Sequence, residues 1–273
     1  MHFLLLPLLS LSLSLSIPAP AVSQAASCFP FEQLPPALQE KADAMLLRAL
    51  DGEALYTIAG GLKPMSSGFV SASIKVDAPD LAAAEEARQI LALFTCGPEI
   101  VAGMHHFANV FQGSRAIEAV VFHRGALKKL LETKRTFFAP YGLSPSSDPM
   151  EVVMAVEYDP TVARLRGYGY LFGYPDHAVD FFAAAAQTQR DEEAKTGKGT
   201  LVPRDFFNLP TARGENRFVY AVPKGHQSNA EDQALRAAAE KVYADYSARR
   251  ARHITGDSPA GVRALIREWL VGR

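Results

Sequence analysis

The chain has 273 residues, of which 48% are hydrophobic and 21% are charged, and its formal net charge at pH 7 is −1. A charge balance this close to neutral excludes the basic surface that nucleic-acid binding requires, so we expect no nucleic-acid partner. The length suffices for one large domain with a sizeable core.

The first 27 residues contain no Lys, Arg, Asp or Glu, and an apolar, serine-rich run extends to Ile17. Prolines and a stretch of small residues follow, which is the order of a secretory signal. We therefore predict a signal peptide over residues 1–27 and an exported protein, periplasmic or extracellular, with one globular domain over 28–273. A short uncleaved anchor is the alternative. No later segment reaches the roughly 20 apolar residues of a spanning helix, so we expect no transmembrane span after signal removal.

The chain has two cysteines, Cys28 and Cys96. In an oxidising compartment they can form a disulfide, which we favour over two unpaired thiols. Cys28 also follows small residues, as the lipidated cysteine of a bacterial lipoprotein does. However, Ala25 stands where such a signal has a bulky aliphatic residue. The sequence therefore favours the disulfide over a lipid anchor at Cys28.

Apolar residues at helical spacing alternate with shorter β-rich runs along the rest of the chain. Capping residues, prolines in first turns and terminal glycines predict helices that begin near Pro36, Pro79, Gly125, Pro149, Pro160, Asp176, Ser228 and Pro259. Alternation and turn residues predict two strands within 54–76, a hairpin over 99–124 and a strand over 217–222. We expect a single α+β domain in which several helices cover a small, mostly antiparallel sheet.

Residues 167–177 (GYGYLFGYPDH) combine glycines and aromatic residues. We interpret them as a helix that ends at Gly173, a turn containing Pro175, and the start of another helix. The alternative is a strand, because the tyrosines alternate with glycines and would form one aromatic face. In the helical interpretation the segment serves mainly for packing, and Tyr170 and Tyr174 are candidate ligand-binding residues.

Histidines lie on both predicted strands of the hairpin. If Gly113-Ser114 is a two-residue loop, His106 and His123 form a diagonal pair on one face, where they could share a metal ion or act as an acid and base pair. Separately buried, hydrogen-bonded histidines are the alternative. The other face carries His105, Asn109 and Glu118 and is expected to be solvated.

A glycine-rich turn over residues 60–68 contains Lys63, Ser66 and Ser67. Its backbone amides, the lysine and the two hydroxyls could hold an anionic group, which makes these three residues candidate ligand-binding residues. An ordinary surface loop is the alternative interpretation.

The signatures of the common serine hydrolases and zinc proteases, Gly-x-Ser-x-Gly and His-Glu-x-x-His, are absent from the sequence. Two functions therefore remain open. One is an exported, hydrolase-type enzyme with a histidine-containing pocket that acts on a small-molecule or extracellular substrate. The other is a non-catalytic envelope or extracellular protein that binds a ligand or partner. The sequence identifies no cofactor, metal or oligomeric state.

Overall fold

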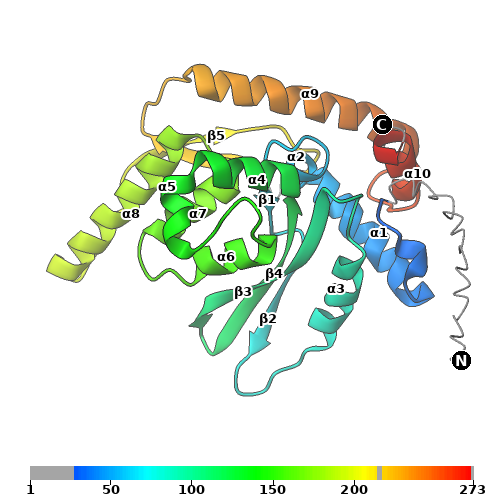
Figure 1. The fold of residues 1–273 in the computed structure, drawn as a ribbon, viewed down its shortest axis with the longest axis horizontal. Helices are drawn as coiled ribbons and strands as arrows, with labels where there is room; N and C mark the ends of the chain where they lie inside the picture. Colours follow the sequence, from blue (N-terminus) through cyan, green and yellow to red (C-terminus); the bar gives the residue numbers. More distant parts are fainter. Residues whose placement is uncertain (1–27, 214–216, 272–273) are drawn as a thin grey trace, which may run out of the picture.

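The computed structural model describes residues 28–213 and 217–271, and Figure 1 shows their arrangement. The predicted signal peptide over residues 1–27 lies outside this part of the chain. The elements follow in the order α1 (Pro36–Asp51), α2 (Leu55–Ile58), β1 (Met65–Ser66), β2 (Ser71–Lys75), α3 (Ala82–Ala92), β3 (Ile100–Phe111), β4 (Ser114–His123), α4 (Arg124–Thr133), α5 (Arg135–Phe138), α6 (Pro149–Glu157), α7 (Ala163–Leu171), α8 (Asp176–Thr196), β5 (Arg204–Asn208), β6 (Val219–Pro223), α9 (Ala230–His253) and α10 (Val262–Ile266). Short 3-10 segments at Phe31–Gln33 and Ala139–Tyr141 and a π-helical end at Arg267–Val271 complete them.

The larger sheet is antiparallel and has β4 at its centre. β3 pairs with one side of β4, while β1 and β2 pair with successive parts of its other side. β5 and β6 form a separate antiparallel pair. This architecture confirms the predicted α+β domain with a small antiparallel sheet.

Strand β4 separates two regions of the core because its side chains alternate between the faces of the sheet. Ile117, Ala119 and Val121 pack into the region built with α1, α2, α3 and α9. Val120 and Phe122 pack into the region built with α4, α6 and α7. All five side chains are buried, so helices cover both faces of this strand.

The first and last long helices are joined by a buried charge network. Asp51, at the end of α1, is fully buried. It accepts a hydrogen bond from the Tyr246 hydroxyl at 2.6 Å, and bonds from the Arg250 guanidinium at 2.7 and 2.9 Å. Arg263 binds Asp43 of α1 at 2.7 Å. In Figure 1 α9 crosses the top of the view and ends beside α10 and α1.

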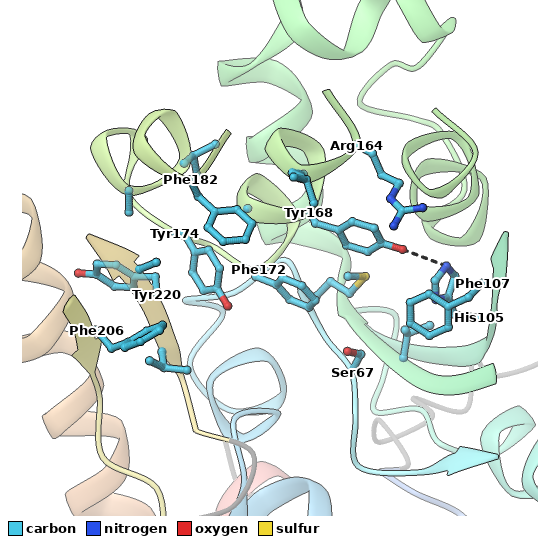
Figure 2. A pocket seen from close by; sticks show the side chains of 18 residues that line it. Ser67, His105, Phe107, Arg164, Tyr168, Phe172, Tyr174, Phe182, Phe206 and Tyr220 are labelled. Carbon is cyan, nitrogen blue, oxygen red and sulfur yellow. Dashed lines mark hydrogen bonds between the residues drawn. The ribbon is translucent and has the colours of Figure 1, made fainter. Parts of the chain in front are cut away.

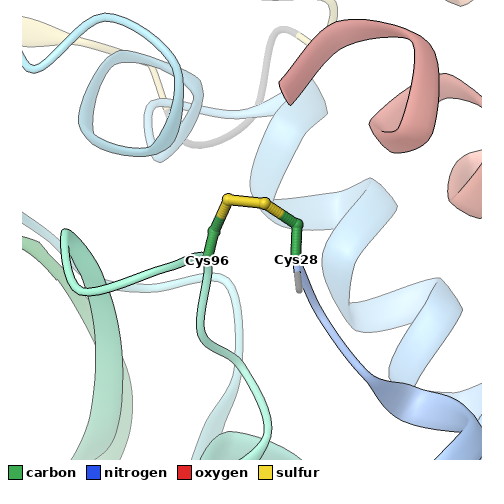
Figure 3. The surroundings of a disulfide bond; sticks show 2 residues. All are labelled: Cys28 and Cys96. Atoms are coloured by element: carbon green, nitrogen blue, oxygen red, sulfur yellow. A yellow bond between two sulfur atoms is a disulfide. The ribbon is translucent and has the colours of Figure 1, made fainter. Parts of the chain in front are cut away.

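The predicted disulfide between Cys28 and Cys96 is confirmed, and it joins the start of the described chain to the segment after α3 (Figure 3). The Phe29 amide donates a hydrogen bond to the Thr95 carbonyl at 2.7 Å beside it. Within the described residues, no helix combines the length and apolar character that crossing a membrane requires.

The helical interpretation of residues 167–177 is confirmed, and the strand alternative is wrong. Helix α7 ends beside Gly173, which has a φ of 71°, and the Tyr174 amide donates to the Gly169 carbonyl at 3.0 Å. A Cβ atom at Gly173 would lie 2.8 Å from the Leu62 carbonyl oxygen. The glycine therefore allows both the left-handed turn and the close approach of another backbone segment.

Two local predictions need correction. Residues Leu55–Ile58, at the start of the segment predicted as two strands, form the helical turn α2, because the end of α1 and the buried Tyr56 pack this segment into the core. The capping box of α9 uses Asn229 and Asp232, one position beyond the predicted Ser228 start. Ser228 and Glu231 have the same three-residue spacing as Asn229 and Asp232, so the sequence alone does not distinguish the two possible capping boxes.

Candidate functional site

A cavity of about 450 Å³ lies between helices α7 and α8, the β5–β6 pair and the adjoining end of the larger sheet (Figure 2). Helix α7 contributes Leu165, Tyr168 and Gly169, and its C-cap residue Phe172 continues the same row. This i, i+3, i+4, i+7 spacing places all four residues on one face of the helix. The regular geometry of α7 therefore forms one wall of the pocket.

Aromatic rings dominate the lining. They run across the pocket from Tyr220 at one end through Tyr174 and Phe172 to Tyr168 at the other, with successive centroids 5.6, 5.8 and 5.8 Å apart. Phe107, Phe182 and Phe206 add further rings. Such distances are typical of favourable aromatic pairs, so the lining is a preformed apolar surface for a flat or elongated ligand.

The end of the pocket beside Tyr168 is polar. The Tyr168 hydroxyl donates a hydrogen bond to the buried Glu157 carboxylate at 2.5 Å and lies 3.2 Å from Nε2 of His105. Glu157 also accepts the Ala108 backbone N–H at 2.7 Å and contacts the Arg164 guanidinium at 3.4 Å. Figure 2 shows the Arg164, Tyr168 and His105 side chains converging here.

Burial sets the protonation states at this end. It raises the pKa of the Tyr168 hydroxyl far above the ordinary tyrosine value, and the hydrogen bond to Glu157 raises it further. Burial also lowers the pKa of His105, although the Glu157 charge opposes this shift. At neutral pH the site therefore offers a protonated tyrosine hydroxyl and a neutral imidazole beside the partly exposed Arg164 guanidinium.

Two residues predicted from the sequence line this pocket, Ser67 and Tyr174. The Ser67 hydroxyl hydrogen-bonds to the Glu118 carboxyl, whose pKa is raised by burial. Burial, reinforced by the charge of Glu53, raises the pKa of the Tyr174 hydroxyl, so this group remains protonated at neutral pH.

The other predicted ligand-binding residues are directed elsewhere. Lys63 is fully buried, forms an ion pair with Glu53, and places its ammonium 5.2 and 4.5 Å from the ring centroids of Phe172 and Phe218. Ser66 is buried against Thr57 at 2.8 Å. The structure thus joins these two residues to the core around α2 instead of to an open anion site.

Tyr170 lies outside the pocket lining. Its ring is nearly buried and packs against Phe137 and Phe138. Tyr170 is two residues from Tyr168, so it points to a different side of α7.

The predicted pairing of His106 with His123 is wrong. The hairpin turn is Gln112-Gly113, one residue before the predicted loop, and the register shifts again between His106 and Val110. His106 pairs with Ile117, which is six positions from His123 on β4, so the histidines lie about 20 Å apart at about 3.4 Å per residue.

Each of these histidines has its own local partners. His123 accepts the Ala126 backbone N–H at 3.2 Å and so caps helix α4. His106 lies 3.3 Å from the Arg88 guanidinium, and its pKa is lowered by burial and then by Arg88 and Arg115. The histidine that reaches the pocket is His105, on the face expected to be solvated.

Comparison of the chain with protein-family models, with curated proteins and with solved structures gives no match. The geometry of the pocket and of the side chains around it is therefore the basis for a functional assignment. Among the described residues, one group has the composition and spacing of metal ligands: His177, His226 and Asp232.

Proposed function

We propose that the protein binds a small, mainly apolar molecule with one polar end. The observation that carries this proposal is the continuous aromatic wall that ends at Tyr168, His105 and Arg164. The cavity volume of about 450 Å³ lies within the range of small-molecule pockets, about 300–1,000 Å³. The ligand body would lie along the rings, and its polar group would meet the hydrogen-bonding end.

The hydrogen bonds that the polar side chains of the pocket already make support ligand binding over catalysis. A hydrolase of the serine type needs a hydroxyl next to a free base. In this pocket the Ser67 hydroxyl is engaged by Glu118, and Nε2 of His105 is engaged by the Tyr168 hydroxyl. A hydrolase-type enzyme remains the second candidate, because His105 does provide a histidine inside a pocket.

The binding proposal can be tested with two fluorescent naphthalene dyes. 1-Anilinonaphthalene-8-sulfonate carries an anionic end, and N-phenyl-1-naphthylamine is neutral. Both should bind the wild-type protein saturably. Val219→Trp should abolish binding of both dyes, because Val219 lines the cavity and the indole would fill it. Val76→Trp is the matched control, since Val76 is an exposed valine outside the pocket.

A third variant tests the polar end. Arg164→Met should weaken the sulfonate dye roughly 10- to 100-fold, the typical effect of losing a hydrogen bond to a charged group, and leave the neutral dye unchanged. Circular dichroism spectra should match the wild type for every variant. Equal dye binding by Val219→Trp and wild type would contradict the proposal.

Export is the proposed cellular setting. The apolar, charge-free leader is typical of a secretory signal. The Cys28–Cys96 disulfide supports this setting, because such bonds persist in oxidising compartments. Intact mass measured on protein from its native host should show loss of roughly the first 20–27 residues.

A further inference from the structure

Three titratable side chains from separate segments meet behind Tyr220, on the far side of the pocket wall. His177 lies in the first turn of α8, His226 follows β6, and Asp232 lies in the first turn of α9. Each offers one ligand atom, and these atoms lie within 4.8 Å of one another. The proposed ligand-binding function does not use this group.

The distances are close to those of a metal centre. Nε2 of His226 lies 2.7 Å from Oδ2 of Asp232, and Nε2 of His177 lies 3.2 Å from Oδ1. In a tetrahedral Zn²⁺ site with bonds of about 2.0–2.1 Å, neighbouring ligand atoms lie about 3.3 Å apart. Side-chain rotations that move each ligand atom by about an ångström or less would therefore place all three atoms at bonding distance from one ion.

His177 provides the second observation. Its Nε2 atom is buried and, despite its proximity to Asp232, has no hydrogen-bond partner among the described residues. A buried polar atom without a partner is costly, so it indicates a missing ligand or an unmade bond. Its other nitrogen, Nδ1, is engaged, 3.3 Å from both the Glu231 carboxylate and the Asn229 amide.

The surrounding contacts hold the ligands in place. The Tyr220 hydroxyl donates to Oδ1 of Asp232 at 2.5 Å, and the Asn229 backbone N–H donates to Oδ2 at 3.1 Å. The imidazole rings of His177 and His226 lie 5.1 Å apart. Outer contacts of this kind orient the ligands of known metal sites and fix histidine tautomers.

We propose that His177, His226 and Asp232 form a binding site for a divalent first-row metal cation such as Zn²⁺. Two imidazoles and one carboxylate suit Zn²⁺ and its neighbours, whereas Mg²⁺ and Ca²⁺ prefer all-oxygen sites. Asp232 is fully buried and the two histidines are partly exposed, so the ion enters from the histidine side. There a water molecule completes the fourth position.

Metal binding would connect α8, the segment after β6 and α9, and the first two of these adjoin the pocket. His177 directly precedes the lining residues Ala178 and Val179 on α8. On β6, the lining residue Tyr220 hydrogen-bonds to the ligand Asp232. Binding exchanges the His226–Asp232 hydrogen bond for bonds from both groups to the ion. The ion thus fixes one wall of the pocket without contacting the pocket ligand.

The test is calorimetric titration of tag-free protein with ZnCl₂, accompanied by the visible spectrum of the Co²⁺-loaded protein. Both cysteines are in the disulfide, so thiols do not compete for the ion. Wild type should bind one equivalent of Zn²⁺, give the absorption of tetrahedral Co²⁺, and not bind Mg²⁺ comparably.

His177→Ala and His226→Ala should each weaken Zn²⁺ binding by roughly 100-fold or more, because even loss of an outer contact costs about 10–100-fold. His106→Ala is the matched control, a partly buried histidine outside the cluster, and should leave affinity unchanged. Absence of one-equivalent binding by wild type would overturn the proposal whatever the variants do. So would undiminished binding in the His177→Ala/His226→Ala double variant.

Discussion

Replacement of Gly169 by alanine should loosen the contact between α7 and α8. A Cβ atom at Gly169 would lie 2.8 Å from Cγ2 and 3.3 Å from Cγ1 of Val179. Favourable carbon–carbon contacts are about 3.5–4.0 Å, so the new methyl group would overlap Val179 by about 0.7 Å. Val179 is buried and β-branched, and valine has one strongly preferred rotamer in a helix. Relief therefore requires the two helices to separate.

Two opposing effects set the magnitude. Overpacking of a tight contact costs about 1–3 kcal/mol, while alanine instead of glycine inside a helix contributes about 1 kcal/mol of stability. The free energy of unfolding should therefore fall by about 1 kcal/mol, and by at most about 2 kcal/mol. Urea unfolding followed by circular dichroism measures this change.

The Val179→Ala background provides the control. Removing the valine methyl groups removes the overlap, so Gly169→Ala should be neutral or stabilising there, where only helix propensity remains. A rise in stability of the wild-type background on Gly169→Ala, or the same effect in both backgrounds, would refute the assignment of a close contact.

Three further predictions concern the Lys63–Glu53 ion pair, the buried His105 and the disulfide. Lys63→Met should cost about 3–5 kcal/mol of stability in urea unfolding because it leaves Glu53 unpaired, and Lys63→Met/Glu53→Gln should recover most of this loss. The pKa of His105 is lowered in the folded state, so the unfolded chain binds the proton more readily and stability falls as the pH drops below about 6.5. His105→Gln should make the difference between the urea unfolding midpoints at pH 7.5 and pH 5.5 smaller than it is in wild type. A difference equal to that of wild type would contradict this prediction. Cys96→Ser should lower the free energy of unfolding by about 2–4 kcal/mol, because the disulfide closes a loop with a sequence separation of 68; a stability equal to that of wild type would refute this role.

The features that the sequence predicted correctly depend on local chemistry. Asp148 precedes Pro149, and in the structure its side chain accepts the Met150 amide at 2.9 Å and caps α6. Gly173 supplies the left-handed turn after α7. Such signals act over a few residues, so they are visible in the sequence without knowledge of the fold.

The hairpin register could not be obtained in the same way. Gln112 has a φ of 48° although it is not a glycine, and the turn therefore includes a residue that turn preferences do not favour. The bulge between His106 and Val110 adds a second shift. Because side chains alternate along a strand, these shifts decide which histidine reaches the pocket.

The rest of the site is assembled by contacts between distant segments. Strand β5 lies outside the segments predicted as strands, and its Phe206 lines the pocket only because β5 pairs with β6. The cluster of His177, His226 and Asp232 spans segments about 50 residues apart, and no local pattern connects them. Helical geometry places Tyr168 and Tyr170 on different sides of α7, but which of them faces the pocket follows only from the orientation of that helix.

The buried carboxylate of Asp51 makes the native surroundings of α1 depend on the last part of the chain. Its partners Tyr246 and Arg250 lie 195 and 199 residues later in the sequence. At about 5–20 residues per second, a ribosome needs roughly 10–40 s to synthesise that interval. Burial of an unpaired charge is unfavourable, so during that interval the Asp51 carboxylate lacks the partners that its native burial requires. The earliest helix of the described chain is thus among the last to reach its native surroundings, and a nascent chain stalled before Tyr246 would leave it open to proteases.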